Sequence, residues 1–273
     1  MGTTPTDDAS SGTRDSEALT SRRLKACSEL LAAVEGWLGE VVPSPQNPWL
    51  VQRQTELILR AIQSMQGILL LAGRFLWIPT YALARMLIED AAVAHWLAVH
   101  PEPDVLEARW RRHLLATHLS DIKTQGELDL ALDPETIRWR KEQDPSELDS
   151  IDDPRRIARD HWTGKSLAEL TGGAAARGAA SRSDWQPRAR ALQRATARFA
   201  PLASLGIHHS PSASQNWYAP PSDLLPEALR IAWHAFSLHA ILALEDLAPT
   251  HLEDLARLID DQAPEFSQPS ADG

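Results

Sequence analysis

Residues 81–96 place two charged side chains inside an otherwise apolar helical segment. At 100° per residue, Tyr81, Arg85, Glu89 and Trp96 lie on one stripe of that helix. Most of the remaining circumference is Leu, Met, Ile, Val and Ala, which is typical of a helix buried in a protein core. Because buried charge is costly unless it is paired and hydrogen-bonded, the segment predicts an ion pair inside a helical bundle.

The order of the two charges leaves two interpretations open. An i,i+4 pair with arginine ahead of glutamate is the less favourable order on an exposed helix, so surface stabilisation explains it poorly. In the first interpretation, Arg85 and Glu89 form a buried polar network that ties this helix to its neighbours. In the second, the pair forms a pocket floor, where Arg85 binds an anion and Glu89 orients it or acts as a base. Tyr81 and Trp96 would then line the same pocket.

The hydrophobic pattern is helical throughout, and no segment shows the sustained alternation of a strand. The expected helices are residues 22–40, 49–74, 79–99, 104–126, 134–142, 153–161, 166–172, 187–204, 224–247 and 250–262. Residues 126–160 are strongly charged and contain three Asp-Pro steps, which indicates short helices at the surface. The fold class is therefore predicted to be all-α: a single-domain irregular helical bundle with a charged excursion of short helices.

Composition predicts one folded domain between two tails. The chain has 273 residues, of which 43% are hydrophobic and 23% charged, enough to bury one large core. Residues 1–20 are rich in Ser, Thr, Asp and Gly, and residues 263–273 are similar, so both tails are expected to be disordered. The predicted domain is residues 21–262.

Cysteine use and hydropathy indicate a soluble, cytoplasmic protein. The single cysteine, Cys27, excludes an intramolecular disulfide, and its apolar helical neighbours predict a packed core residue. The polar N-terminus lacks the apolar core of a signal peptide. Charged residues and a proline interrupt the most hydrophobic region, residues 67–99, so no run approaches the roughly 18 apolar residues of a membrane span. No membrane partner is therefore expected.

A compact polar turn follows the expected helix 187–204. It contains His208, His209 and Ser210, and functional side chains often gather on such loops. A capped turn with histidines near a helix C-terminus is an equally ordinary explanation, because the helix dipole there favours a cation. If the turn covers the stripe of residues 81–96, His208 or His209 would supply a general base and Ser210 a hydrogen bond.

One helix is locally basic although the chain has a net charge of −10, which argues weakly against a nucleic-acid binder. Arg190, Arg194 and Arg198 form an i,i+4 stripe opposite apolar residues. The stripe is either a solvated face or a contact for phosphate or RNA. Three pairs of histidines have i,i+5 spacing, which does not present two ligands side by side, so neither a metal nor another cofactor is expected.

The run that begins at Arg112 and ends at His118 has the form Arg, polar residue, four residues, His. This form is similar to the motif of HEPN ribonucleases, which are helical bundles that act on RNA without a metal. By that resemblance, Arg112 and His118 take the catalytic positions and His113 takes the intervening polar one. The alternative is that residues 109–113 form an exposed, partly aromatic helix face.

Further motifs resemble an uncharacterised family of bacterial all-helical proteins, a domain of unknown function. The motifs are an aromatic-x-x-x-Arg-x-x-x-Glu helix at Tyr81, Arg85 and Glu89, a Trp-x-Gly-Lys-Ser-like segment at residues 162–166, and a Ser-x-x-x-His turn at Ser204 and His208. The resemblance extends over about residues 50–215. It implies a helical fold and the grouping of these residues, and it implies no particular activity.

These residues predict a metal-independent effector or nuclease-like enzyme acting on a phosphate-bearing substrate, in the manner of helical toxin and defence proteins. The expected partner is RNA or a phosphate-bearing small molecule. The alternative is a non-enzymatic ligand-binding or protein-assembly module in which Arg85 and Glu89 form a buried network. A homo-oligomer is compatible with both.

Overall fold

The computed structural model describes residues 8–39, 48–100, 102–128, 130–166, 169–170, 190, 194 and 224–267. Every regular element in these ranges is a helix, so the prediction of an all-α fold is confirmed. The described residues form two compact units, unit 1 within Met1–Val99 and Leu167–Gly273, and unit 2 within His100–Ser166. None of the described helices is both long enough and apolar enough to cross a membrane.

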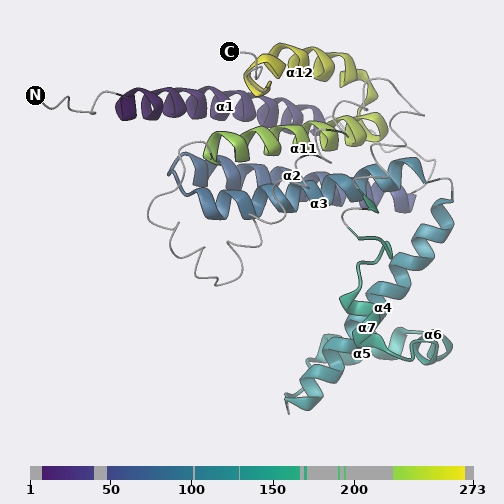
Figure 1. Ribbon diagram of the computed structural model, residues 1–273. Helices are drawn as coiled ribbons and strands as arrows, with labels where there is room; N and C mark the ends of the chain where they lie inside the picture. Colours follow the sequence, from purple (N-terminus) through teal and green to yellow (C-terminus); the bar gives the residue numbers. More distant parts are fainter. Residues whose placement is uncertain are drawn as a thin grey trace, which may run out of the picture. The chain divides into compact units, whose positions relative to one another are not determined.

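Unit 1 is a bundle built around α11 (Figure 1). Its elements are α1 (Asp8–Leu38), α2 (Pro48–Ala72), α3 (Trp77–Val99), α11 (Leu224–Leu247), the 3-10 helix η1 (Pro249–His251) and α12 (Leu252–Phe266). The helix α11 contacts α1, α2, α3 and α12, and 17 of its 24 residues are buried. Because it has neighbours on several sides, α11 is apolar around most of its circumference.

The core of unit 1 combines large side chains with alanines that let the helices approach closely. Trp233 and Phe236 of α11 are almost fully buried, and so are the small residues Ala91 and Ala94 of α3. The helices α2 and α3 approach closely at Gly67, where a Cβ atom would lie 2.7 Å from Cδ1 of Leu83. The expectation that Cys27 is a core residue is confirmed, and burial raises the pKa of its thiol.

Both ends of unit 1 are helical farther than composition suggests. The expected tail reaches residue 20, but α1 begins at Asp8. Thr20 is buried within this helix and satisfies its hydroxyl by donating to the carbonyl of Ser16. At the other end, α12 continues to Phe266 past Pro264, because the ring of Phe266 stacks on Trp233 with centroids 4.4 Å apart. Burial of one aromatic ring thus outweighs the local preference for a tail.

A hydrogen-bonded glutamine joins three helices of unit 1. Gln262 of α12 accepts from Nε1 of Trp233 on α11 at 2.8 Å, and it donates to the carbonyl of Ala26 on α1 at 3.0 Å. Both groups of its amide are therefore satisfied in a buried position. Arg23 of α1 supports the same seam by donating to the carbonyls of Pro226 and Glu265.

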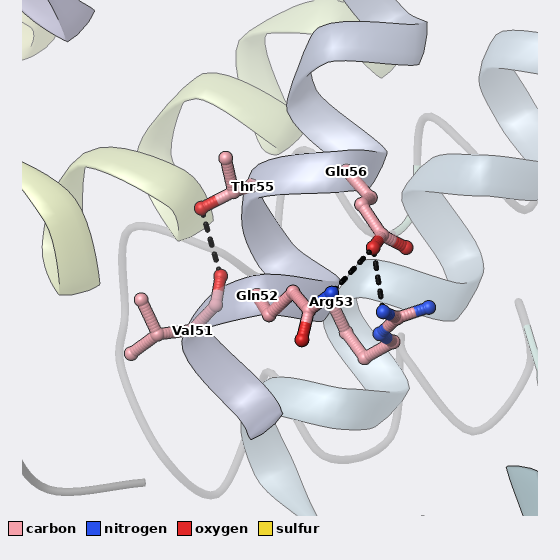
Figure 2. A network of polar contacts seen from close by, with 5 residues as sticks. All are labelled: Val51, Gln52, Arg53, Thr55 and Glu56. Atoms are coloured by element: carbon pink, nitrogen blue, oxygen red, sulfur yellow. Dashed lines mark hydrogen bonds and ion pairs between the residues drawn. The ribbon is translucent and has the colours of Figure 1, made fainter. Parts of the chain in front are cut away.

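Near the start of α2, a smaller polar network lies on the helix surface (Figure 2). Gln52 and Arg53 both donate to Oε1 of Glu56, one turn farther along. The hydroxyl of Thr55 donates a hydrogen bond to the carbonyl of Val51 at 2.8 Å. These contacts are all local to one helix, so they stabilise its first turns rather than assemble a site.

Unit 2 consists of one long helix and three short ones, α4 (Pro103–Glu127), α5 (Pro134–Glu142), α6 (Pro145–Asp149) and α7 (Pro154–Arg159). Each short helix begins at an Asp-Pro step, where the aspartate accepts hydrogen bonds from amides of the first turn. The predicted excursion of short helices is therefore confirmed. The sequence predicts one domain at residues 21–262. In the structure, the contacts within that range form two separate compact units.

A small apolar cluster holds unit 2 together. Leu115 and Ala116 of α4 are buried with Ile151, which lies between α6 and α7. Partly buried side chains surround them; these are Leu119, Trp139, Leu148 and Ile157. Contacts between α4 and α7 place the segment after α7 alongside the first half of α4.

Candidate functional site

The Arg85–Glu89 ion pair forms, but it is not buried. Nε of Arg85 lies 2.8 Å from Oε1 of Glu89, and the two side chains are 32% and 41% exposed. Their flanking stripe residues, Tyr81 and Trp96, are both buried, at 3% exposure. The expectation of a buried pair is therefore wrong for these two residues, because the stripe turns toward solvent in its middle turn.

The charge that α3 does bury is Asp90. Its side chain is 9% exposed, and Oδ1 lies 3.2 Å from Nη2 of Arg60 on α2. Burial raises the pKa of Asp90 to about 6, while the charge of Arg60 opposes that shift. A sequence signal was present, since apolar residues lie three, four and seven positions away on the same face; they are Leu83, Leu87, Ala94 and Leu97.

The predicted histidine turn cannot be compared with α3. His208, His209 and Ser210 lie outside the described residues, so their convergence with Arg85 and Glu89 stays a prediction. Of the basic stripe, Arg190 and Arg194 are described, and both are helical and exposed.

Unit 2 contains an open cleft of about 550 Å³ between α4 and the segment that runs from α7 to residue 165. Arg109, Arg112 and His113 of α4 form one side. The lining residues on the other side are Arg156, Ile157, Asp160, His161, Trp162, Thr163, Gly164 and Lys165. Four cationic side chains thus face a cleft with one carboxylate, although unit 2 as a whole has 15 acidic and 11 basic residues.

The arginines of the cleft differ from their sequence neighbours in their ion pairing. Arg111 pairs with Glu107, and Arg155 pairs with Glu127. In contrast, no carboxylate in the described part of the chain lies within ion-pair distance of Arg109, Arg112 or Arg156. The cleft therefore brings together three arginines whose charge no described carboxylate neutralises at ion-pair distance, which favours an anionic ligand.

His113 lies partly buried in the cleft. Burial lowers its pKa, and this effect is opposed by a hydrogen bond to the backbone of Ile157 and by the charge of Asp160. The lowered pKa favours the neutral ring at pH 7, and a neutral imidazole keeps one ring nitrogen as an acceptor.

A tight turn after α7 orients a second histidine. Nδ1 of His161 lies 2.7 Å from the hydroxyl of Thr163 and accepts from the Thr163 amide at 3.3 Å. Since Nδ1 accepts an N–H bond, a neutral His161 ring carries its proton on Nε2. Gly164 closes the turn with φ of +66°, a conformation that favours glycine, and its amide donates to the His161 carbonyl.

The same turn positions an aromatic side chain in the cleft. The ring of Trp162 meets Trp110 of α4 edge to face, with centroids 5.2 Å apart and planes at 84°. The ring of His161 lies on Trp162 at a centroid distance of 6.2 Å. Thr163, directly after this tryptophan, is fully buried and anchors the turn. Trp162 is therefore held in place by its neighbours and remains half-exposed to the cleft.

The two residues of the HEPN-like motif point to different surroundings. Arg112 lines the cleft, whereas the ring of His118 packs against Trp139 at a centroid distance of 4.4 Å. Two residues six positions apart on an α-helix point about 120° away from each other. Arg112 and His118 therefore lie on different faces of α4. The sequence assigned His113 only the intervening polar position of this motif and placed Trp162 in a Trp-x-Gly-Lys-Ser-like segment without a role, and it did not single out His161.

Comparisons with known proteins find no similar protein. No protein-family model matches the chain, and neither a curated protein nor a solved structure does. Among the described residues, no group of three or more His, Cys, Asp or Glu side chains is arranged to hold a metal ion.

Proposed function

We propose that unit 2 binds a phosphate-bearing substrate in its cationic cleft and that this substrate is RNA. The observation that carries the proposal is the set of three arginines, Arg109, Arg112 and Arg156, that line one cleft and have no ion pair with any described residue. Arginine is suited to phosphate because its planar guanidinium donates two parallel hydrogen bonds. Lys165 adds a fourth positive charge at the same cleft.

The charge of the remaining chain makes this local concentration informative. The whole protein has a net charge of −10, so unspecific attraction to a polyanion is weak. Screening confines exposed charges to about 8 Å at physiological ionic strength, so the ligand responds to the cleft more than to the distant acidic residues. Binding of RNA would therefore depend on the residues that line the cleft.

A nuclease-like reaction is the finer part of the proposal. His113 is neutral near pH 7 and keeps one ring nitrogen as an acceptor, which suits a general base. Arg112 comes from the same turn of α4 and would stabilise negative charge on a reacting phosphate.

The cleft also supports a second candidate, a ligand-binding module without chemistry of its own. Nδ1 of His161 is occupied by Thr163, which suits a ring that is fixed to hold a ligand rather than one that exchanges protons at that nitrogen. In this version the anion is bound and released unchanged.

The proposal is tested by fluorescence anisotropy with a labelled single-stranded RNA. Arg112→Ala and Arg156→Ala are each expected to weaken binding about tenfold or more, since each removes a charge-assisted bond. Arg111→Ala and Arg155→Ala are matched controls, because these neighbours pair with glutamates. Equal losses in all four variants, or no binding by the wild type, would contradict the assignment of the cleft.

Catalysis is tested separately by gel analysis of the same RNA. We expect His113→Asn to abolish cleavage and retain binding, and His118→Asn, on the Trp139 side of α4, to leave cleavage unchanged. Wild-type binding without cleavage would favour the ligand-binding module over the nuclease.

A further inference from the structure

We infer that the cleft recognises unpaired nucleotides and that Trp162 is the surface on which a base stacks. This inference rests on the proposed function, because it assumes that the arginines bind the phosphates of the same ligand. It adds the class of RNA, single-stranded and not duplex, and it names the residue that distinguishes the two.

The cleft is lined by both cationic and aromatic side chains. Proteins that bind single strands combine cations along the backbone with aromatic rings for the bases. Here Arg109 and Arg112 lie on α4, and Trp162 follows α7 in the lining of the same cleft. A ligand held by only its phosphates would need the arginines and would leave the tryptophan without a role.

The rigidity of the turn carries the second step. Trp162 is braced edge to face by Trp110, and the next residue, Thr163, is buried and bonded to His161 and to the amide of Lys165. A preoriented ring loses little conformational freedom when a base stacks on it. Trp110 is therefore a positioning residue, whereas Trp162 touches the ligand.

The size of the cleft carries the third step. A volume of about 550 Å³ falls in the range of sites that enclose a small molecule, so it admits a nucleotide-sized part of a strand. Bases in a duplex are already stacked on their neighbours and are closed to an aromatic side chain. Only an unpaired nucleotide places its base and its phosphate in this cleft together.

The experiment measures the affinity of the full-length protein for three competitors: a single-stranded RNA, the same strand as a duplex, and inorganic polyphosphate. Trp162→Leu is expected to weaken single-strand binding roughly 5- to 100-fold, which corresponds to one lost stacking contact, and to leave polyphosphate binding unchanged. Trp162→Phe is expected to retain most of the affinity. Trp139→Phe is the matched control, because that ring packs on His118 outside the cleft and the substitution keeps an aromatic side chain in the apolar cluster of unit 2.

A measurement on the wild type makes the test independent of how the variants fold. An abasic oligonucleotide with the same phosphates is expected to bind more weakly than the intact strand by a similar factor. Equal affinity for the abasic and intact strands, equal affinity for duplex and single strand, or equal losses of polyphosphate and RNA binding in Trp162→Leu would overturn the inference. Failure of both polyphosphate and RNA to bind the wild type would instead remove the proposed function.

Discussion

Nη2 of Arg60 lies 3.2 Å from Oδ1 of Asp90, and this ion pair joins α2 to α3 at a point where the carboxylate is almost fully buried. The arginine is 58% exposed, so water reaches one partner and not the other. The other carboxylate oxygen of Asp90, Oδ2, is buried without a hydrogen bond. Asp90 is therefore held in an environment that only partly compensates its charge.

Asp90→Asn is expected to change how the stability of the protein depends on pH. The folded-state pKa of Asp90 is raised to about 6 from 3.8, so its contribution is fully present below pH 3.8 and is lost as pH rises through 6. The slope is about 1.4 kcal/mol per pH unit, or about 3 kcal/mol over the window. Urea unfolding at several pH values measures it. Parallel curves for variant and wild type would show that Asp90 titrates normally.

His239 on α11 is expected to act in the opposite direction. It is fully buried, and burial lowers its pKa to about 3, with the charge of Arg60 acting in the same sense. Its contribution to stability is therefore present above pH 6.5 and is lost as pH falls toward 3. His239→Gln should remove this rise of stability with pH, which leaves the opposite slope of Asp90 between about pH 4 and 6. If the curve of the variant has the same slope as that of the wild type, the buried neutral histidine is the wrong explanation.

Both residues change the free energy of unfolding between about pH 4 and 6, and they do so in opposite directions. As pH rises, the contribution of Asp90 decreases and that of His239 increases. The wild type should therefore show a flatter curve in this window than either single variant. The double variant Asp90→Asn, His239→Gln should be flat as well, and opposite slopes in the two single variants are what separate cancellation from the absence of titration.

Two arginines in short-range helix pairs are expected to differ in their effect on stability. Arg85 and Glu89 are 32% and 41% exposed, so Arg85→Ala should cost less than about 1 kcal/mol. Arg230 and Glu227 are 12% and 16% exposed, so Arg230→Ala removes one cationic partner from a nearly buried carboxylate and should cost more, up to about 3 kcal/mol. Thermal unfolding of both variants measures the two losses of stability. A larger loss in Arg85→Ala than in Arg230→Ala would show that the Arg85–Glu89 pair is the structurally important one.

Most of the fold was readable in the sequence because local signals agreed with the tertiary structure. The Asp-Pro steps at residues 133, 144 and 153 both cap and start α5, α6 and α7, and no distant contact is needed to place them. Helix ends that depend on packing were harder. Phe266 extends α12 only because Trp233 lies 4.4 Å away, and those two residues are 33 positions apart.

The candidate site was harder to predict from the sequence. Hydrophobic periodicity shows which residues share one face of a helix, but it does not show what that face contacts. Glu89 and Asp90 are adjacent, and only the apolar residues three and four positions from Asp90 distinguish the buried carboxylate from the exposed one. In α4, Glu107 lies four positions before Arg111, and the structure pairs these two side chains. The opposite side of the cleft, at His161 and Trp162, follows about 50 residues later, and no local pattern joins it to Arg112.

Gln262→Leu tests the polar seam of unit 1. The substitution would leave Nε1 of Trp233 without its acceptor at 2.8 Å, and it would remove the 3.0 Å bond to the carbonyl of Ala26, which lies inside α1 and keeps its helical partner. One unsatisfied buried donor costs about 1–3 kcal/mol, so a loss of about that size in unfolding free energy is expected. Gln262→Glu keeps an acceptor for Trp233 and should show a different loss from the apolar variant. A wild-type melting temperature in Gln262→Leu would mean that these bonds are replaced on relaxation.

The salt dependence of RNA binding tests how many cleft cations neutralise phosphates. For a single strand, the slope of log K against log salt is about −0.7 for each phosphate neutralised. If Arg109, Arg112 and Arg156 each contact one phosphate, the wild-type slope is about −2, and each alanine variant brings it closer to zero by about 0.7. Arg111→Ala, whose arginine is paired with Glu107, should keep the wild-type slope. A slope that Arg111→Ala and Arg112→Ala reduce equally would place the phosphates along the outer face of α4 and not in the cleft.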